Sequence, residues 1–181
     1  MVPTAATRLA SVSLAVVLVH PLLILLHGFP EFWWAWRLQI APLVEAGFHV
    51  VVPDMRGYGR SSAPTDAALY TPLHTTGDLI GLLDSLNISS AVLVGHDWGA
   101  THAWNAALLR PDRFAAVFCL SVPYVPRGDV SVFERMRKSD HQNSFYMFEQ
   151  IRPDADQIWA DASVTIPGIL YWASGSAPAD K

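Results

Sequence analysis

The sequence predicts an α/β protein with a mostly parallel sheet and flanking helices, and three observations support this prediction. Short apolar runs typical of buried parallel strands alternate with stretches of helical periodicity. The 181 residues are 51% hydrophobic and only 15% charged, which indicates a packed core and excludes a disordered chain. Strand and helix follow each other repeatedly, an order that requires right-handed crossovers.

The expected elements are bounded by recognisable end signals. Thr71 and Pro72 are an N-cap and a first helical residue, while Gly47 and Pro111 stop the helices before them. No initial β-hairpin is recognisable. We expect strands at 22–26, 49–53, 91–94 and 114–122, and helices at 34–46, 72–86 and 99–109.

The chain changes character after Pro123. The remaining stretch is rich in aromatic and Asp residues and has no further strong strand pattern. We therefore assign residues 1–123 to the core with the sheet and residues 124–181 to an added helical segment. Four prolines break up this segment: Pro126, Pro153, Pro167 and Pro178.

The amino-terminal stretch from residue 9 to residue 26 is almost entirely apolar. Such a run is typical of a secretory or membrane-anchoring segment. However, His20 and Pro21 interrupt it, and its second half reads as the first buried strand. We expect a cytoplasmic protein, with secretion or membrane anchoring as open alternatives.

Charge and cysteine content exclude several classes of function. The net charge is −4 and the basic residues are scattered, so we expect no nucleic-acid partner. The single cysteine, Cys119, lies in an apolar run and is expected to be a buried hydrophobe rather than a reactive thiol. No spacing of His, Cys or Glu indicates a metal site, and we expect no cofactor.

The strongest motif is Gly-His-Asp-Trp-Gly at 95–99, which follows an apolar strand and opens a helix. A nucleophile flanked by small residues at such a bend is a nucleophile elbow. Gly95 and Gly99 are expected there because side chains would collide in a tight turn. The usual nucleophile is serine, but here it is Asp97. A carboxylate is already ionised at neutral pH and can attack a saturated carbon that bears a leaving group.

An oxyanion hole is also predicted. Elbow enzymes take one backbone N–H from the residue after the nucleophile, here Trp98, and another from the loop after an earlier strand. That loop is His-Gly-Phe-Pro at 27–30, so Phe29 is the expected second donor. We expect His27 and Gly28 to organise the loop rather than to transfer protons. His96 is expected to point into the sheet and to be structural.

Three motifs together resemble the epoxide-hydrolase branch of the α/β-hydrolase superfamily. They are His-Gly-Phe-Pro-Glu at 27–31, Asp-Met-Arg-Gly-Tyr-Gly at 54–59, and the elbow at 95–99. The match runs from about Leu22 to Pro126. The resemblance implies a partial α/β-hydrolase fold followed by the start of a helical cap. It also implies an alkyl-ester intermediate on Asp97 and a small apolar epoxide as substrate.

The resemblance assigns two further residues. In the family, cap tyrosines donate a proton to the epoxide oxygen, and the segment at 145–150 before Pro153 is similar to the one that carries the first of them. Tyr146 is therefore the expected catalytic proton donor, although Asp154 replaces the usual glycine after Pro153. A packed cap aromatic is the alternative interpretation of Tyr146. Trp33 is expected to contact substrate.

Dehalogenases of the same superfamily are the nearest alternative. Haloalkane dehalogenases usually have a halide-binding Asn where Phe29 stands. Haloacetate dehalogenases generally have Arg after the nucleophile, where this chain has Trp98. These two residues together favour epoxides.

The other half of the expected machinery is missing from the sequence. The family's triad continues with an acid and a histidine on later loops, but His141 is the only histidine after Pro123. We therefore expect a truncated hydrolase that forms the ester and cannot turn it over. The alternative is an inactive remnant that binds small apolar molecules or a partner. An incomplete sheet would also expose the edge beside the fourth strand, which predicts self-association.

Overall fold

The computed structural model describes residues 11–14, 21–138 and 146–177. The chain forms two compact units, Met1–Tyr124 and Val125–Lys181, and each is described by itself. His141 and most of the apolar run before residue 20 lie outside the described residues.

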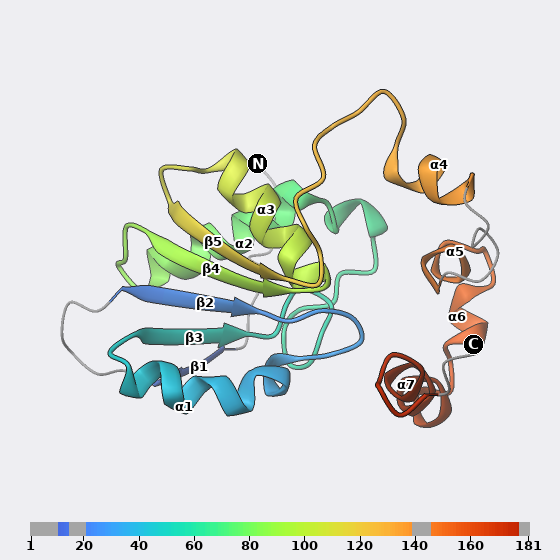
Figure 1. Cartoon of the computed structure of the whole chain (residues 1–181), viewed down its shortest axis with the longest axis horizontal. Coiled ribbons are helices and arrows are strands. Elements are labelled where there is room, and N and C mark those ends of the chain that lie inside the picture. The colour runs from blue at the N-terminus through green and yellow to red at the C-terminus, as the bar shows by residue number, and fades with distance from the viewer. Residues whose placement is uncertain (1–10, 15–20, 139–145, 178–181) are drawn as a thin grey trace. The chain divides into compact units, whose positions relative to one another are not determined.

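Unit 1 contains a mostly parallel sheet (Figure 1). Its order is β1-β3-β2-β4-β5, and every pairing is parallel except the antiparallel pairing of β1 with β3. The predicted α/β class and parallel sheet are therefore confirmed. The strands are β1 (Ser11–Leu14), β2 (Leu22–Leu26), β3 (His49–Pro53), β4 (Ala91–His96) and β5 (Phe114–Leu120).

The first strand corrects the sequence analysis, which recognised no strand before residue 22. Ser11–Leu14 forms β1 and runs antiparallel along β3, with Ser11 opposite Pro53. The strand has only four residues and lies inside the apolar run that resembles a leader segment. Because so short a strand offers almost no periodicity, its pattern did not stand out.

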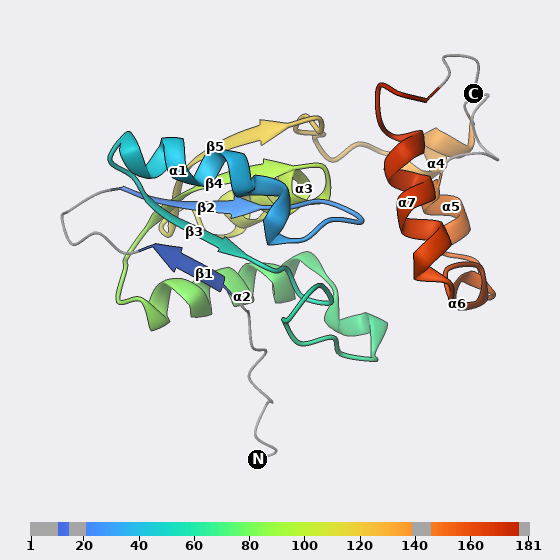
Figure 2. The ribbon, with the colours of Figure 1, turned by 90° about the horizontal axis from the view of Figure 1, so that it is seen from below.

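Helices cover both faces of the sheet (Figure 2). Alternate residues of β2 point to opposite faces: Ile24 and Leu26 pack against α2 and α3, while Leu23 and Leu25 pack on the α1 side. All five residues of β2 are at most 5% exposed, which explains its unbroken apolar sequence. The helices of unit 1 are the 3-10 turn η1 (Trp33–Trp36), α1 (Arg37–Glu45), η2 (Ala67–Leu69), α2 (Pro72–Ser85) and α3 (Trp98–Leu109).

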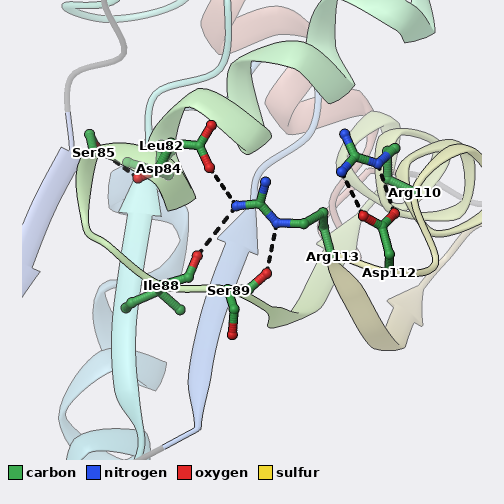
Figure 3. A network of polar contacts seen from close by, with 8 residues as sticks. All are labelled: Leu82, Asp84, Ser85, Ile88, Ser89, Arg110, Asp112 and Arg113. Atoms are coloured by element: carbon green, nitrogen blue, oxygen red, sulfur yellow. Dashed lines mark hydrogen bonds and ion pairs between the residues drawn. The ribbon is translucent and has the colours of Figure 1, made fainter.

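Arg113 fastens the sheet at the ends of the strands opposite the elbow (Figure 3). Its guanidinium donates to the carbonyl of Ser89 at 2.7 Å and to the carboxylate of Asp84 at 2.6 Å. Its own carbonyl accepts from the N–H of Ala91 at 2.9 Å. One side chain therefore joins the end of α2, the turn before β4 and the start of β5.

Strand β5 is the edge of the sheet within the described residues. Val117 and Cys119 pack toward α3, whereas Phe118 and Leu120 on the other face are 60% and 40% exposed. Such an apolar edge is available for pairing. Self-association through it stays a prediction.

Unit 2 consists of short helices around a small apolar pocket. The pocket has a volume of about 390 Å³ and is bordered by Tyr146, Trp159 and Trp172 among others. Within the described ranges, none of the helices has the length and apolar character needed to span a bilayer. The helices of unit 2 are α4 (Val132–Arg137), α5 (Tyr146–Gln150), α6 (Ala155–Ile158) and α7 (Ala162–Trp172).

Candidate active site

Asp97 stands at a sharp bend between β4 and α3. Its backbone dihedrals are φ 54° and ψ −122°, a conformation with positive φ that residues other than glycine rarely adopt. Such strain persists where surrounding packing enforces it, and it is typical of functional sites. The residue lies at the carboxyl end of a central parallel strand, where open α/β sheets bind their ligands.

The bend depends on the two glycines that flank it. A Cβ atom on Gly95 would lie 2.6 Å from Cα of Ala100, and one on Gly99 would lie 2.7 Å from the carbonyl oxygen of His27. Both distances are shorter than real Cβ contacts. Side chains at these positions would therefore push α3 away from the sheet.

The loop after β2 closes over the Asp97 carboxylate. The Phe29 N–H donates to Oδ1 of Asp97 at 2.8 Å. A Cβ atom on Gly28 would lie 2.6 Å from the same oxygen, so only glycine permits this approach. Trp98, the other predicted donor, is the first residue of α3, where a backbone N–H has no partner within the helix.

His27 holds this loop through contacts of its imidazole ring with the backbone. Its Nε2 accepts from the Met55 N–H at 2.9 Å, and its Nδ1 lies 2.9 Å from the Gly28 carbonyl. Because Nε2 accepts, the proton resides on Nδ1 and is donated to that carbonyl. The ring is 2% exposed, and its burial lowers the pKa of His27. His27 is therefore a neutral, fully hydrogen-bonded side chain.

A second contact between loops in this region was not predicted from the sequence. Asp54 is 1% exposed; its Oδ1 accepts from the Trp33 N–H at 2.9 Å and its Oδ2 from the Arg60 N–H at 3.0 Å. It thus joins the loop after β2 to the loop after β3. The only signal was its place directly after an apolar strand. Next to it, the Arg56 guanidinium makes a bidentate pair with the Asp78 carboxylate, at 2.9 and 2.7 Å.

His96 differs from the prediction that it points into the sheet. Gly95 packs against α3, and strand alternation therefore turns the neighbouring His96 to the opposite face, at the end of the strand. There the side chain is 42% exposed, and its Nδ1 lies 3.3 Å from Oε2 of Glu31. The prediction was wrong because the loop after β2, rather than the core, receives this side chain.

A second histidine lies near the elbow and is partly buried. His102 is on α3, and its Nδ1 lies 3.2 Å from Oγ1 of Thr75 on α2. The Thr75 hydroxyl donates to the Pro72 carbonyl, so the His102 ring is the donor in this contact. Burial, with a smaller contribution from His27, lowers the pKa of His102 to about 4.

The two remaining predicted residues are Trp33 and Tyr146. Trp33 begins η1 and is partly buried against the α1 side of the core. Tyr146 begins α5 in unit 2 and borders the pocket there. Among the described residues, no group of three or more His, Cys, Asp or Glu side chains is arranged to hold a metal ion.

Comparison with known proteins shows the class. The model of the alpha/beta hydrolase fold family matches residues 21–166, which is most of the chain. The chain therefore belongs to the α/β-hydrolase family.

Its relatives are epoxide hydrolases. The chain is 75% identical, over 158 residues, to an epoxide hydrolase of Caballeronia sordidicola, with 87% of this chain and 48% of the relative covered. It is 50% identical over 127 residues to epoxide hydrolase A of Mycobacterium tuberculosis, with 70% and 39% covered. The chain thus spans about half the length, or less, of these curated relatives. The resemblance to the epoxide-hydrolase branch is confirmed.

Solved structures agree with these relatives. An epoxide hydrolase from an endophytic Streptomyces superposes with a TM-score of 0.84 at 34% identity, with 96% of this chain and 55% of that chain covered. Epoxide hydrolase A of Mycobacterium thermoresistibile gives a TM-score of 0.75 at 44% identity, with 86% and 52% covered.

Proposed function

We propose that this chain carries the nucleophile of an epoxide hydrolase, and that the nucleophile is Asp97. The observation that supports the proposal most strongly is the 2.8 Å hydrogen bond from the Phe29 N–H to Oδ1 of Asp97. Because Oδ1 is held by the loop, Oδ2 is the oxygen available for attack. A carboxylate needs no separate base for this step.

In the first step a lone pair of Oδ2 attacks one epoxide carbon. The bond between that carbon and the epoxide oxygen breaks, and its electron pair stays on the oxygen. The oxygen takes up a proton from the hydroxyl of Tyr146, which we propose as the donor because of its resemblance to the family's cap tyrosine. The product is an ester between Asp97 and the ring-opened substrate.

In the second step water attacks the ester carbonyl, whose oxygen is the former Oδ1. The N–H groups of Phe29 and Trp98 would stabilise the tetrahedral oxyanion, and each such donor contributes about 3–4 kcal/mol. Deprotonation of the water requires a general base. The sequence after Pro123 contains one histidine, His141, and no loop expected to place it at the ester. We therefore propose that this chain stops at the ester.

Intact mass spectrometry after incubation with styrene oxide tests the proposal. We expect one covalent adduct on the unmodified chain and on the Asp129→Asn control, which changes an exposed loop carboxylate. Asp97→Asn should form none. Absence of an adduct with epoxides of varied size, or an adduct that persists in Asp97→Asn, would contradict the nucleophile assignment. Diol release over many turnovers would instead contradict the arrest at the ester.

An inactive remnant that binds small apolar molecules is the second candidate. The observation in its favour is the apolar pocket of unit 2, whose lining residues belong to another unit than Asp97. Binding of styrene oxide without adduct formation would favour this reading. A dehalogenase is distinguished by the same assay, since 1-bromobutane would then alkylate Asp97 and styrene oxide would not.

A further inference from the structure

Two contacts, rather than one, join the loop after β2 to the elbow. Phe29 meets Asp97 through a backbone N–H at 2.8 Å. Two residues further along the same loop, Oε2 of Glu31 meets Nδ1 of His96 at 3.3 Å. His96 directly precedes Asp97, so the contacts are consecutive along the elbow.

The loop between the two contacts is a closed turn. The Glu31 N–H donates to the Gly28 carbonyl at 3.0 Å, while Gly28 packs against the Asp97 side chain. Within so short a turn the backbone at Phe29 cannot move independently of Glu31. We therefore expect a displacement of the Glu31 side chain to change the direction of the Phe29 N–H.

We propose that Glu31 is a positioning residue: through its contact with His96 it holds the Phe29 N–H against the Asp97 carboxylate. This proposal rests on the proposed role of Asp97 as nucleophile. Glu31 does not contact the reacting atoms itself. It fixes which carboxylate oxygen is held and which is free to attack.

The charges of the pair support this role. Hydrogen bonding to His96 lowers the pKa of Glu31, and the same contact with Glu31 raises the pKa of His96, with Asp97 as a lesser contributor. The ionisable groups that act on the pair are Asp97 and His27, and His27 is buried. The ion pair therefore persists to higher pH than it would with an ordinary histidine, and it weakens as pH rises through the raised pKa of His96, because the imidazole then loses its charge.

The Phe29 amide resonance tests the proposal without any reaction. Between pH 5.5 and 8.5 we expect its ¹H shift to follow the titration of His96, since the hydrogen bond to Asp97 weakens as the pair is lost. Glu31→Gln should move this shift upfield and abolish its titration. Glu45→Gln, which changes an exposed glutamate at the end of α1, should behave as the unmodified chain. A Phe29 shift and titration that are unchanged in Glu31→Gln would overturn the proposal.

Two further variants test the same contact independently. If Glu31→Gln fails to give a folded amide spectrum, His96→Gln removes the charge from the other side and should have the same effect on Phe29. Glu31→Asp should retain part of the titration. The rate of Asp97 alkylation should fall two- to fivefold in Glu31→Gln, as expected for the loss of a partly exposed ion pair worth up to about 1 kcal/mol. If the unmodified chain forms no adduct, the proposed function fails while the amide test still decides the positioning role.

Discussion

His102 makes the stability of unit 1 depend on pH in a way that can be measured. The side chain is partly buried beside α2, and its pKa is lowered from 6.5 to about 4, chiefly by desolvation. In the unfolded chain His102 binds a proton with the ordinary histidine pKa, whereas in the folded chain it binds one only at lower pH. Between these two values the unfolded state holds more protons, so stability must rise with pH.

The size of the effect follows from the gap between the two pKa values. Each tenfold change in proton affinity corresponds to about 1.4 kcal/mol. The full contribution of His102 to the pH dependence of the free energy of unfolding is therefore about 3 kcal/mol. The folded state has this stabilisation in full above pH 6.5 and loses it progressively as the pH falls toward 4. Between pH 7 and pH 5, about 2 kcal/mol should disappear.

Urea denaturation at pH 7 and pH 5 measures this loss. His102→Gln is the matched variant, because its amide can still donate to Thr75 but carries no titratable group. The unmodified chain should lose about 2 kcal/mol more than the variant. His27, whose pKa is also lowered by burial, is present in both proteins, so its contribution cancels. Equal losses in the two proteins, or an NMR midpoint for His102 near 6.5, would refute the reasoning.

Three other perturbations follow from contacts in unit 1. Gly28→Ala places a methyl group 2.6 Å from Oδ1 of Asp97, so it should lower the stability by about 1–3 kcal/mol and slow adduct formation. Gly81→Ala, with open space around its Cβ, is the control and should reduce neither the stability nor the rate of adduct formation. Asp78→Asn leaves the Arg56 guanidinium, 6% exposed, without its charge partner, so urea denaturation should show a loss of about 3–5 kcal/mol; a loss below about 1 kcal/mol would contradict it. Arg113→Lys removes the forked contacts at the ends of the strands and should cost about 1–2 kcal/mol, seen as a lower thermal midpoint, whereas an unchanged midpoint would show that these contacts do not stabilise the fold.

Much of the sheet and its helices could be predicted because their signals are local. The strand at 22–26 matches β2 residue for residue, since a strand buried on both faces requires an unbroken apolar run. The helix from Pro72 begins as its N-cap pattern indicates, although Thr71 makes no side-chain capping bond. The first helix instead starts as a 3-10 turn at Trp33–Trp36, which periodicity alone does not distinguish.

The candidate site was predictable only in part, because only some of its features have a local signal in the sequence. The elbow is contiguous in sequence, and its motif carries its own geometry. Contacts between distant segments leave no such trace: Glu31 and His96 are 65 residues apart, and Arg56 and Asp78 are 22 apart. Each of these side chains would be ordinary on a surface. Only the fold decides that they meet, and alternation along β4 decides which way His96 faces.

The contacts around Asp97 bear on its proposed role as the nucleophile. The neighbours of Asp97 include Gly28, Phe29 and the carbonyl of Leu120 that accepts from its N–H, and all of these belong to unit 1. A carboxylate nucleophile needs no general base for its attack. A serine hydroxyl in the same place would need a base. Asp97→Ser should therefore form no adduct with styrene oxide even if the elbow keeps its shape. An adduct on the serine would mean that a base is present within the chain, and the arrest at the ester would then have no physical ground.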